Sequence, residues 1–433
     1  MGSFSTPLSG LMAAQDQLQS VSNNLANIDT NGYKTQTLTF GDIFAAASQT
    51  NGAGNPLQTG AGVAVSSTDS NFTEGNLNST STSSNMAISG NGFFVTKSAT
   101  GSTDYTRAGD FTVNSAGELT TPNGELVLGY PAAAGVVNTS GTLQPLQVGS
   151  GVTMPAQVST KVDFTANLDS DTAVNGTATS SPLSVYDSLG SAHTLSITYT
   201  KTAANTWDYS VTVPSADLTG ATGTTWVVGS GTLNFNGSGA LTSTTNVVPI
   251  SLGGAGSAAV VGPPAIAAVP ATSLADGATS PLTLSGPFGT AASPTITQTA
   301  SASTTSTATT DGFKSGTLST YAVQPDGTIE GTFSNGSTLA VGQVAVASFA
   351  NVQGLSSTGN NNYQPTAASG SAVIGLAGTG GRGTIIGGDV EQSNVNIATE
   401  FAKLIVAQQA YSSNAKSITT FNQVSQATLA MIQ

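Results

Sequence analysis

The sequence predicts a mainly β protein whose N- and C-terminal ends are α-helices that pair as a coiled coil. Apolar residues recur at heptad spacing near both ends of the 433-residue chain. Between the ends, short strand-like runs alternate with tight-turn residues. A change of composition after about residue 150 predicts a second β domain. The expected fold is therefore nested and multi-domain, with two β domains of which the outer one is inserted in the inner one.

The N-terminal helix is predicted over residues 5–28, because its apolar residues follow heptad steps of three, four and seven. Asn31-Gly32 predicts the end of the helix, since glycine commonly follows a helix C-terminus. The residues expected to pack in the coiled-coil seam or between subunits are Phe4, Leu8, Leu11, Leu18, Val21, Leu25 and Ile28.

A longer C-terminal helix is predicted from Ser393 or Asn394, either of which can cap it. A helix of about 40 residues is about 60 Å long, so its seam needs the N-terminal helix, neighbouring subunits or both as cover. Neutral amide and hydroxyl side chains flank both seams, which favours packing against copies of the same chain. An ordinary antiparallel helix pair on a globular protein is the alternative. The expected packing residues are Ile397, Phe401, Leu404, Tyr411, Ile418, Leu429 and Ile432.

The domain bounds follow from composition and turn signals. Residues 31–75 show little periodicity and predict an extended linker with short ordered pieces at 38–40 and 43–44. The Ser/Thr/Ala run 295–310 predicts a loop or a poorly packed edge. The expected domains are a terminal helical domain (1–30 and 393–433), the linker (31–75), a first β domain (76–150 and 313–392) and an inserted outer β domain (151–312).

Charge and composition exclude several classes of function. Charged residues make up 7% of the chain, against about 25% in a typical soluble domain, and the net charge is −13. An acidic chain repels nucleic acid and anionic lipid, and no run of about 18 apolar residues predicts a membrane-spanning helix. The absence of cysteine excludes a disulfide framework and a thiolate site. The N-terminus lacks the basic and apolar regions of a cleaved signal peptide.

No residue pattern predicts catalysis or a cofactor. His193 is the only histidine, and without a recognisable Ser or Asp partner it is interpreted as a surface or strand-edge residue. Asp163, Asp169 and Asp171 could hold a cation loosely, but solvated loop acids are the favoured interpretation. We therefore expect no catalytic, cofactor-binding or metal site, and no enzymatic activity.

The glycine-rich segments 90–92 and 378–383 are interpreted as turns. Neither contains the Gly-Lys-Ser/Thr of a phosphate-binding loop. Glycine runs more often mark positions with positive φ, which side chains disfavour.

Residues 22–34, Ser-Asn-Asn-Leu-Ala-Asn-Ile-Asp-Thr-Asn-Gly-Tyr-Lys, resemble the N-terminal signature of the bacterial flagellar rod and hook family. Residues 391–396, 400–416 and 105–111 are similar to that family too. Residues 185–193 and 315–349 resemble its hook members in particular. The positions that match the signature are Asn23, Asn24, Leu25, Ala26, Asn27, Gly32, Tyr33 and Lys34.

The resemblance implies a structural subunit that assembles into a homopolymer. The polymer would be a curved, flexible tube that acts as a universal joint and transmits torque from rod to filament. The helices would line the inner tube. Partners would be the distal rod, the hook cap, the hook–filament junction and the flagellar type III export proteins. The subunit would be extracellular, in the flagellar basal body and hook, and exported without a cleaved signal peptide.

Two other functions remain as alternatives. Residues 35–62 look longer than the corresponding linker of many hook proteins, and distal rod subunits of the same family carry extra residues there. The second alternative is a β-rich surface adhesin. Coiled-coil helices at both ends of a nested chain argue against an adhesin.

Overall fold

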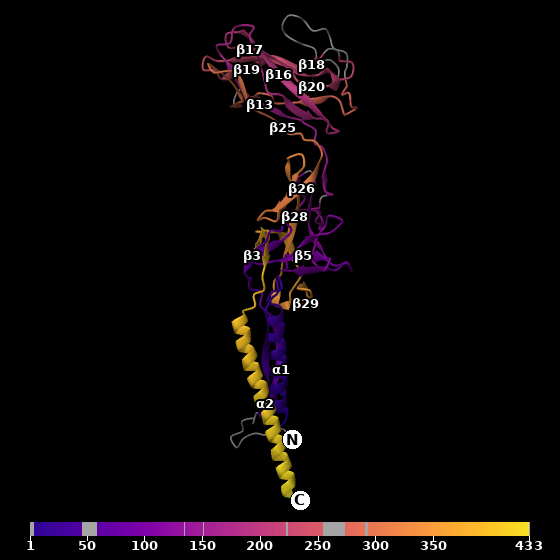
Figure 1. Cartoon of the computed structure of the whole chain (residues 1–433), viewed down its shortest axis with the longest axis vertical. Coiled ribbons are helices and arrows are strands. Elements are labelled where there is room, and N and C mark those ends of the chain that lie inside the picture. Colours follow the sequence, from indigo (N-terminus) through magenta and orange to yellow (C-terminus); the bar gives the residue numbers. More distant parts are fainter. Residues whose placement is uncertain are drawn as a thin grey trace. The chain divides into compact units, whose positions relative to one another are not determined.

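A computed structural model of the chain describes residues 4–45, 59–133, 135–149, 151–221, 224–253, 273–290 and 293–432. The chain forms two compact units (Figure 1). Unit 1 comprises Met1–Val152, Thr320–Thr332 and Thr338–Gln433, and unit 2 comprises Thr153–Ser319 and Phe333–Ser337. The predicted mainly β fold with a helix at each end is confirmed. The terminal helices and the first β domain, which the sequence analysis separates, share unit 1.

The two helices, α1 (Ser5–Ala26) and α2 (Ile397–Ile432), lie side by side and antiparallel (Figure 1). The Phe4 and Phe421 rings are 6.0 Å apart at one end of the pair. At the start of α2 the Asn396 side chain accepts a hydrogen bond from Thr399 N (3.1 Å). The predicted cap at Ser393 or Asn394 is therefore wrong. Asn394 cannot cap α2, because its side-chain oxygen accepts from Thr35 N (2.8 Å).

The segment predicted as an extended linker contains a long antiparallel hairpin. Its strands are β1 (Gln36–Ala45) and β2 (Thr59–Ser70), with two register shifts along the pair. The hairpin is fastened to α1, since Ser9 Oγ accepts from Val63 N (3.2 Å) and Ser20 Oγ donates to Gln36 O (3.4 Å). Packing on α1 accounts for two strands whose own sequence lacks regular alternation. Residues 46–58 lie outside the described residues.

A sheet with both faces covered forms the β body of unit 1. Its central order is β27-β28-β9-β5-β6-β30-β29. Side chains alternate between two cores, because successive strand residues point to opposite faces. In β5, for example, Phe94 packs in one core while Phe93 and Val95 pack in the other.

Most strands of the β body are short, and the 3₁₀ turn η2 (Val352–Gly354) lies among them. The strands are β3 (Leu77–Ser79), β4 (Met86–Ser89), β5 (Phe93–Lys97), β6 (Thr103–Thr106), β7 (Thr112–Val113), β8 (Leu119–Thr120), β9 (Leu126–Ala133), β10 (Val136–Val137), β11 (Gln144–Pro145), β28 (Thr338–Ser348), β29 (Ser356–Gly359), β30 (Asn362–Gln364), β31 (Val373–Leu376), β32 (Thr384–Gly387) and β33 (Asp389–Glu391); β26 (Gly316–Val323) and β27 (Thr328–Phe333) have residues in both units.

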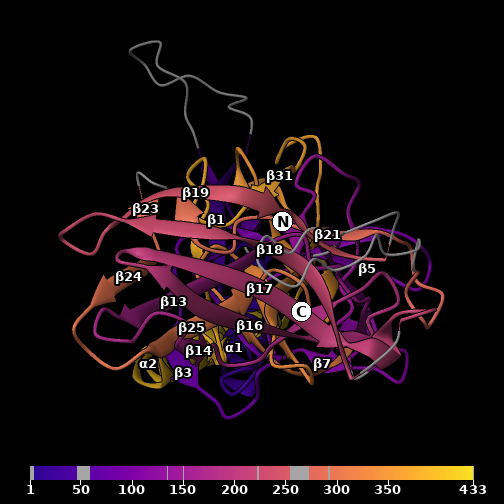
Figure 2. The ribbon, with the colours of Figure 1, turned by 90° about the horizontal axis from the view of Figure 1, so that it is seen from above.

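Unit 2 is built around one apolar core. Strands β16, β17 and β18 run side by side (Figure 2), and β13 contributes the alternating side chains of a second sheet to the same core. Trp207 is fully buried, and its Nε1 donates to Gln298 Oε1 (3.1 Å). The burial of this indole is therefore accompanied by the hydrogen bond that its N–H requires.

The predicted loop or edge at 295–310 consists largely of strands. β24 and β25 flank β13 on either side, so the run supplies two edge strands of a three-stranded sheet. Threonine is β-branched and suits an extended backbone, and pairing with β13 satisfies its hydrogen bonds. The elements of unit 2 are β12 (Thr153–Met154), β13 (Val162–Asp169), β14 (Thr177–Thr179), β15 (Leu183–Tyr186), β16 (Ala192–Ala203), β17 (Thr206–Pro214), η1 (Ser215–Asp217), β18 (Thr225–Phe235), β19 (Leu241–Val248), β20 (Ile250–Leu252), β21 (Leu282–Leu284), β22 (Gly289–Thr290), β23 (Ser293–Pro294), β24 (Ile296–Thr299) and β25 (Thr304–Thr310).

Candidate functional site

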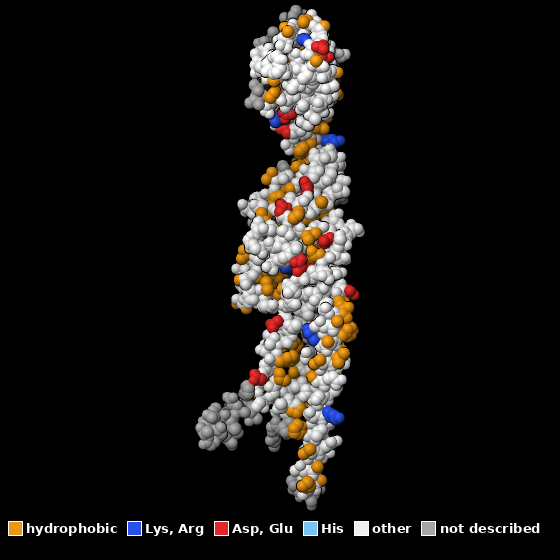
Figure 3. Space-filling model, turned by 90° about the vertical axis from the view of Figure 1, so that its left-hand side faces the viewer, with side chains coloured by type: hydrophobic (Ala, Val, Ile, Leu, Met, Phe, Trp, Pro, Cys, Tyr) orange, Lys and Arg blue, Asp and Glu red, His pale blue; other side chains and the backbone are white. Residues whose placement is uncertain are grey.

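The helix pair exposes large apolar side chains, which we call the apolar stripe. Figure 3 shows such side chains along the helices, with few acidic or basic ones among them. An exposed apolar surface of this kind usually marks an interface with another molecule. The stripe consists of Phe4 just before α1, of Leu8 and Met12 on α1, and of Ile397, Phe401, Ile405, Val406, Tyr411, Phe421, Val424, Leu429 and Met431, which lie on more than one side of α2.

A different face joins the two helices within the chain. Ala14 and Val21 of α1 and Ala407 of α2 are buried. A Cβ on Gly10 would lie 2.9 Å from Asn414 Nδ2, so the helices approach closely there. Because α1 and α2 contact each other through small side chains, much of the apolar surface of the two helices is not covered within the chain.

The predicted packing residues are divided between these two surfaces. Val21 is buried. Leu11, Leu18, Leu25, Ile28, Leu404 and Ile418 are half-buried, while Phe4, Leu8, Ile397, Phe401, Tyr411 and Leu429 are exposed, and the side chain of Ile432 lies outside the described residues. The heptad pattern does not include the exposed Met12, Ile405, Val406, Phe421, Val424 and Met431, although the adjacent pair Ile405-Val406 indicates an exposed apolar surface wider than one heptad seam.

The end of α1 and the start of α2 meet in a buried polar network. Asn24, 1% exposed, donates to Glu400 Oε2 (3.0 Å) and to Gln36 O (2.8 Å). Its side-chain oxygen accepts from Gln36 N (2.9 Å) and from Tyr33 Oη (3.0 Å). Glu400 Oε1 accepts from Lys403 Nζ (2.7 Å). Asn24 thus uses all of its hydrogen-bonding capacity, and only an amide could make this set of contacts.

A buried ion cluster adjoins this network. Lys34 Nζ lies 2.6 Å from Glu391 Oε1, and both side chains are 0% exposed. Arg107 Nη1 lies 3.4 Å from Glu391 Oε2. Glu391 Oε1 also accepts from Gly75 N (2.8 Å), and Lys34 donates to Thr73 O (2.8 Å). We call Asn24, Tyr33, Lys34, Arg107, Glu391 and Glu400 the terminal junction, because together they bind both chain ends to the β body.

Burial dominates the electrostatics of the terminal junction. It lowers the pKa of Lys34, an effect that the Glu391 carboxylate opposes, and it lowers the pKa of Arg107 in the same way. Burial, with a smaller contribution from Glu400, raises the pKa of Tyr33 to about 12. Removing one partner from such a buried set leaves an uncompensated charge, which typically costs about 3–5 kcal/mol.

The remaining signature residues shape the turn that leads into the junction. Gly32 has φ +70°, and a Cβ there would lie 2.5 Å from Ala108 N, so only glycine fits. Asn23 Nδ2 donates to Tyr33 Oη (3.2 Å), and Asn27 Nδ2 donates to Asn23 O (2.9 Å). Leu25 is half-buried and Ala26 is exposed. Most of the signature therefore encodes the junction, and Leu25 also borders the helix pair.

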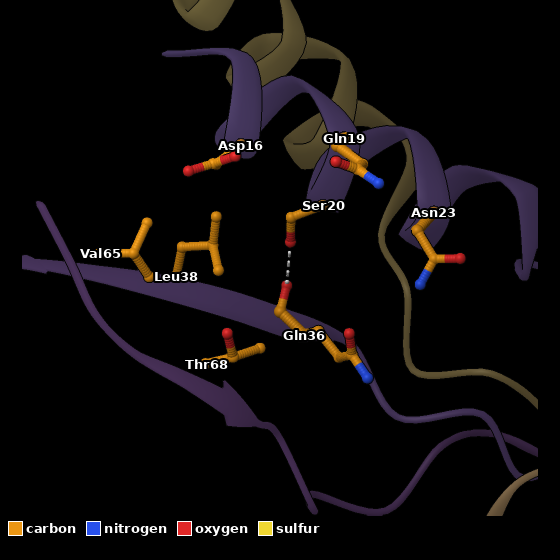
Figure 4. A pocket seen from close by; sticks show the side chains of 8 residues that line it. All are labelled: Asp16, Gln19, Ser20, Asn23, Gln36, Leu38, Val65 and Thr68. Atoms are coloured by element: carbon orange, nitrogen blue, oxygen red, sulfur yellow. Dashed lines mark hydrogen bonds between the residues drawn. The ribbon is translucent and has the colours of Figure 1, made fainter. Parts of the chain in front are cut away.

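A groove of about 600 Å³ lies between α1 and the β1–β2 hairpin (Figure 4). Its lining is mainly neutral and polar, and Asp16 supplies its only carboxylate. Nothing in this set of side chains resembles a nucleophile with its base. The lining residues are Asp16, Gln19, Ser20, Asn23, Gln36, Leu38, Val65 and Thr68.

His193 in unit 2 is buried, so its interpretation as a surface or strand-edge residue is wrong. It is 4% exposed, because η1 and the turn after β15 fold over it. Its Nε2 lies 3.1 Å from Asp187 Oδ2, and its Nδ1 lies 3.2 Å from Asp217 Oδ2. The sequence placed Asp187 six residues before His193, and that spacing around a turn was the available signal.

The other candidate sites are explained by local structure. Asp163 pairs with Lys161 (3.0 Å), and Asp169 Oδ1 accepts from Asp171 N (2.8 Å). Gly90 has φ +99°, as a turn glycine does. In the described part of the chain, neither helix is apolar enough over a sufficient length to cross a membrane.

Four models of flagellar families match separate parts of the chain, two of which overlap. They are described as flagella basal body rod protein (residues 4–34), flagellar hook protein FlgE/F/G D1 domain (87–167), flagellar basal body protein FlaE D2 domain (154–313) and flagellar basal body rod FlgEFG protein C-terminal (386–431).

Curated relatives match over nearly the whole chain. The flagellar hook protein FlgE of Treponema pallidum is 33% identical to this chain, and the alignment covers 97% of each protein. FlgE of Escherichia coli is 33% identical, with 97% of this chain and 98% of that protein covered. Among solved structures, the Helicobacter pylori hook protein FlgE2 aligns with a TM-score of 0.47 at 16% identity, over 71% of this chain and 98% of that one.

Proposed function

The chain belongs to the flagellar hook protein family, and on that premise we propose that its terminal helices build the hook by packing their apolar stripes against those of neighbouring subunits. The family gives the chain the function of a structural subunit of the flagellar hook, rather than of a distal rod subunit or a surface adhesin. The observation that carries the proposal is the uncovered apolar surface of α1 and α2.

The composition of the helices supports packing against identical copies. Ile405 and Val406, in the first third of α2, are 57% and 62% exposed. The last part of α2 bears Val424, Leu429 and Met431, exposed by 58%, 63% and 85%. Like charges that repeat along a homopolymer would repel one another, and the neutral faces around the stripe avoid that repulsion. Burial of the stripe on assembly is therefore favourable.

Polymerisation is expected to increase the helix content of the subunit. A helix gains most of its stability from packing on its apolar face, and the stripe has that packing only in the polymer. Circular dichroism at 222 nm should therefore show a stronger helical signal per residue in the tube than in the monomer. An equal signal in the two states would argue against coupled folding and assembly.

Unit 2 is proposed to be separable from tube formation. The chain enters it through Thr153 and Met154 and leaves it through Gly316 and Thr317, and these residues pair as antiparallel β12 and β26. Adjacent ends allow a short turn to replace what lies between them. We expect a variant with residues 155–315 replaced by a short Gly/Ser turn to form tubes of altered curvature, because contacts between outer domains would set the spacing of neighbouring subunits.

Electron cryo-microscopy of cells that carry this replacement measures both outcomes. Loss of all tubes, with unit 1 still folded, would contradict separability. Tubes of unchanged curvature would remove the mechanical role of unit 2. The full-length chain expressed at the same level is the control.

The proposed assembly is a curved, flexible tube that acts as a universal joint and transmits torque from rod to filament. Its proposed partners are the distal rod, the hook cap, the hook–filament junction and the type III export proteins. The subunit would reach the cell exterior. We propose that it acts by assembly alone and not as an enzyme, in agreement with the structural role of its family.

A further inference from the structure

Three side chains of unit 2 converge from separate segments. Asp187 lies in the turn between β15 and β16, His193 lies on β16, and Asp276 lies in the loop before β21. One ligand atom from each lies within 4.8 Å of the others. Asp187 is held in place because its Oδ1 accepts from Leu189 N (2.8 Å) and Ser191 N (2.9 Å). Its Oδ2 is left facing His193 Nε2 at 3.1 Å.

The second ring nitrogen of His193, Nδ1, has no hydrogen-bond partner, which indicates that the cluster lacks a cation. His193 is 4% exposed, and its buried Nδ1 forms no hydrogen bond although Asp217 Oδ2 is 3.2 Å away. A neutral imidazole carries one N–H. If that proton bonds Asp187 from Nε2, the unprotonated Nδ1 lies 3.2 Å from the Asp217 carboxylate, which is repulsive. A cation on Nε2 would move the proton to Nδ1, which the Asp217 carboxylate attracts by charge, without the geometry of a hydrogen bond.

The charges around His193 also favour a bound cation. Three carboxylates, those of Asp187, Asp217 and Asp276, surround one imidazole. Among the ion pairs of the described residues, none joins these carboxylates to a lysine or an arginine. Carboxylates gathered this closely repel one another unless they share a proton or a cation.

We infer that Asp187, His193 and Asp276 bind a divalent transition-metal cation of the Zn²⁺ type, with Asp217 as the carboxylate that orients the imidazole. Metal-bound histidine commonly donates its other ring N–H to a carboxylate in this way. Ligands at about 2.1 Å around a tetrahedral ion lie about 3.4 Å apart, close to the spacing of His193 Nε2 and Asp187 Oδ2. An imidazole ligand favours this class of ion over Ca²⁺ and Mg²⁺.

The ion would fasten the loop of Asp276 to the β15–β16 turn. A hydrogen bond from Thr279 N to Ser188 Oγ (2.9 Å) and side-chain contacts of Asp276 with Asp187 and Ser191 already link that loop to the turn. All four residues of the proposed site belong to unit 2. A test of this site is therefore independent of the proposal that the helices drive polymerisation.

The single histidine makes a direct test possible in the full-length monomer. After treatment with EDTA, one equivalent of ZnCl₂ is added and the ring nitrogens are observed by ¹⁵N NMR. We expect the Nε2 resonance to move to a metal-bound position and Nδ1 to carry the proton. The inference is overturned if neither resonance moves, or if the ring is an imidazolium that Zn²⁺ does not displace.

Two variants distinguish binding of Zn²⁺ at this site from a nonspecific attraction of Zn²⁺ to acidic residues. Asp276→Asn is exposed and should fold, and we expect it to bind Zn²⁺ about tenfold more weakly or worse in isothermal titration calorimetry. Asp171→Asn, at an exposed aspartate of the same unit, is the matched control and should bind like the parent chain. Equal binding by both variants, or the same ¹⁵N shift on adding Ca²⁺, would overturn the inference. Trp207 fluorescence verifies that unit 2 is folded.

Discussion

Replacing Glu391 with Gln is expected to destabilise unit 1 by about 3–5 kcal/mol, because the buried Lys34 and Arg107 both lose their charged partner. The amide keeps the size of the side chain, so the loss is electrostatic and not a cavity. Its –NH₂ group also points a donor at cations that are themselves donors. The terminal junction should then open, and both chain ends should separate from the β body.

Hydrogen exchange measured by mass spectrometry follows this change locally, in peptides that cover residues 27–36 and 389–400. Tryptophan fluorescence is an internal control, since both tryptophans, Trp207 and Trp226, belong to unit 2 and should report unchanged unfolding. Glu330→Gln is the matched variant, because Glu330 bonds only Gln324 at the surface, and its effect should stay within about 0.5 kcal/mol.

A double-mutant cycle with Lys34→Met shows whether the pair itself is responsible. Residues in one buried ion cluster should couple, so the double variant should lose less stability than the two single variants added together. The role assigned to the terminal junction is refuted if Glu391→Gln behaves like Glu330→Gln, or if the two losses simply add.

Removal of residues 419–433 is expected to abolish tube formation while leaving both units folded. The deletion takes away Phe421, Val424, Leu429 and Met431 of the apolar stripe. It removes the Phe4–Phe421 ring contact at one end of the helix pair, but it spares the hydrogen bond of Asn24 with Glu400 and the close approach of the helices at Gly10 and Asn414. The measurement is sedimentation and electron microscopy under conditions in which the full-length chain polymerises. Tubes formed by the truncated chain would show that this part of the stripe does not drive assembly.

Point substitutions distinguish apolar surface from helix length. Burying a Val or Leu side chain contributes about 1.5–3 kcal/mol, so Val424→Ser with Leu429→Ser should raise the critical concentration about a hundredfold or more. Gln423→Ser with Gln426→Ser changes exposed polar residues of the same turns and should leave it nearly unchanged. Similar critical concentrations for the two pairs would mean that length, not the stripe, governs assembly.

Local patterns were sufficient for the elements that short-range physics governs. The heptad steps around Leu11 and Leu18 predict α1, and the corresponding steps around Leu404 and Ile418 predict α2, because a helix repeats its face about every 3.6 residues. The tight-turn residues between strand-like runs predict hairpins, since glycine tolerates the positive φ seen at Gly124 (+85°) between β8 and β9. The mainly β fold with terminal helices follows from these patterns alone.

Where the pattern was weak, packing on a distant segment decided the structure. The β1–β2 hairpin was predicted as a linker because its apolar residues do not alternate regularly, and contacts of Ser9 and Ser20 on α1 support it instead. His193 was predicted to be at the surface. Its position at the start of a strand does not show which distant segments pack over that strand. Asp217 and Asp276, which lie near it, are far along the chain.

By itself the sequence determined the two terminal helices, the mainly β character of what lies between them, and that an apolar surface at the chain ends needs a partner. Only the tertiary structure decided which part of that surface stays uncovered, because the small residues Gly10, Ala14 and Ala407 let the helices meet on a face next to the predicted seam. The tertiary structure also brings together the residues of the terminal junction. Lys34 and Glu391 are 357 positions apart, so their attraction appears only after the fold brings both into one buried, low-dielectric place.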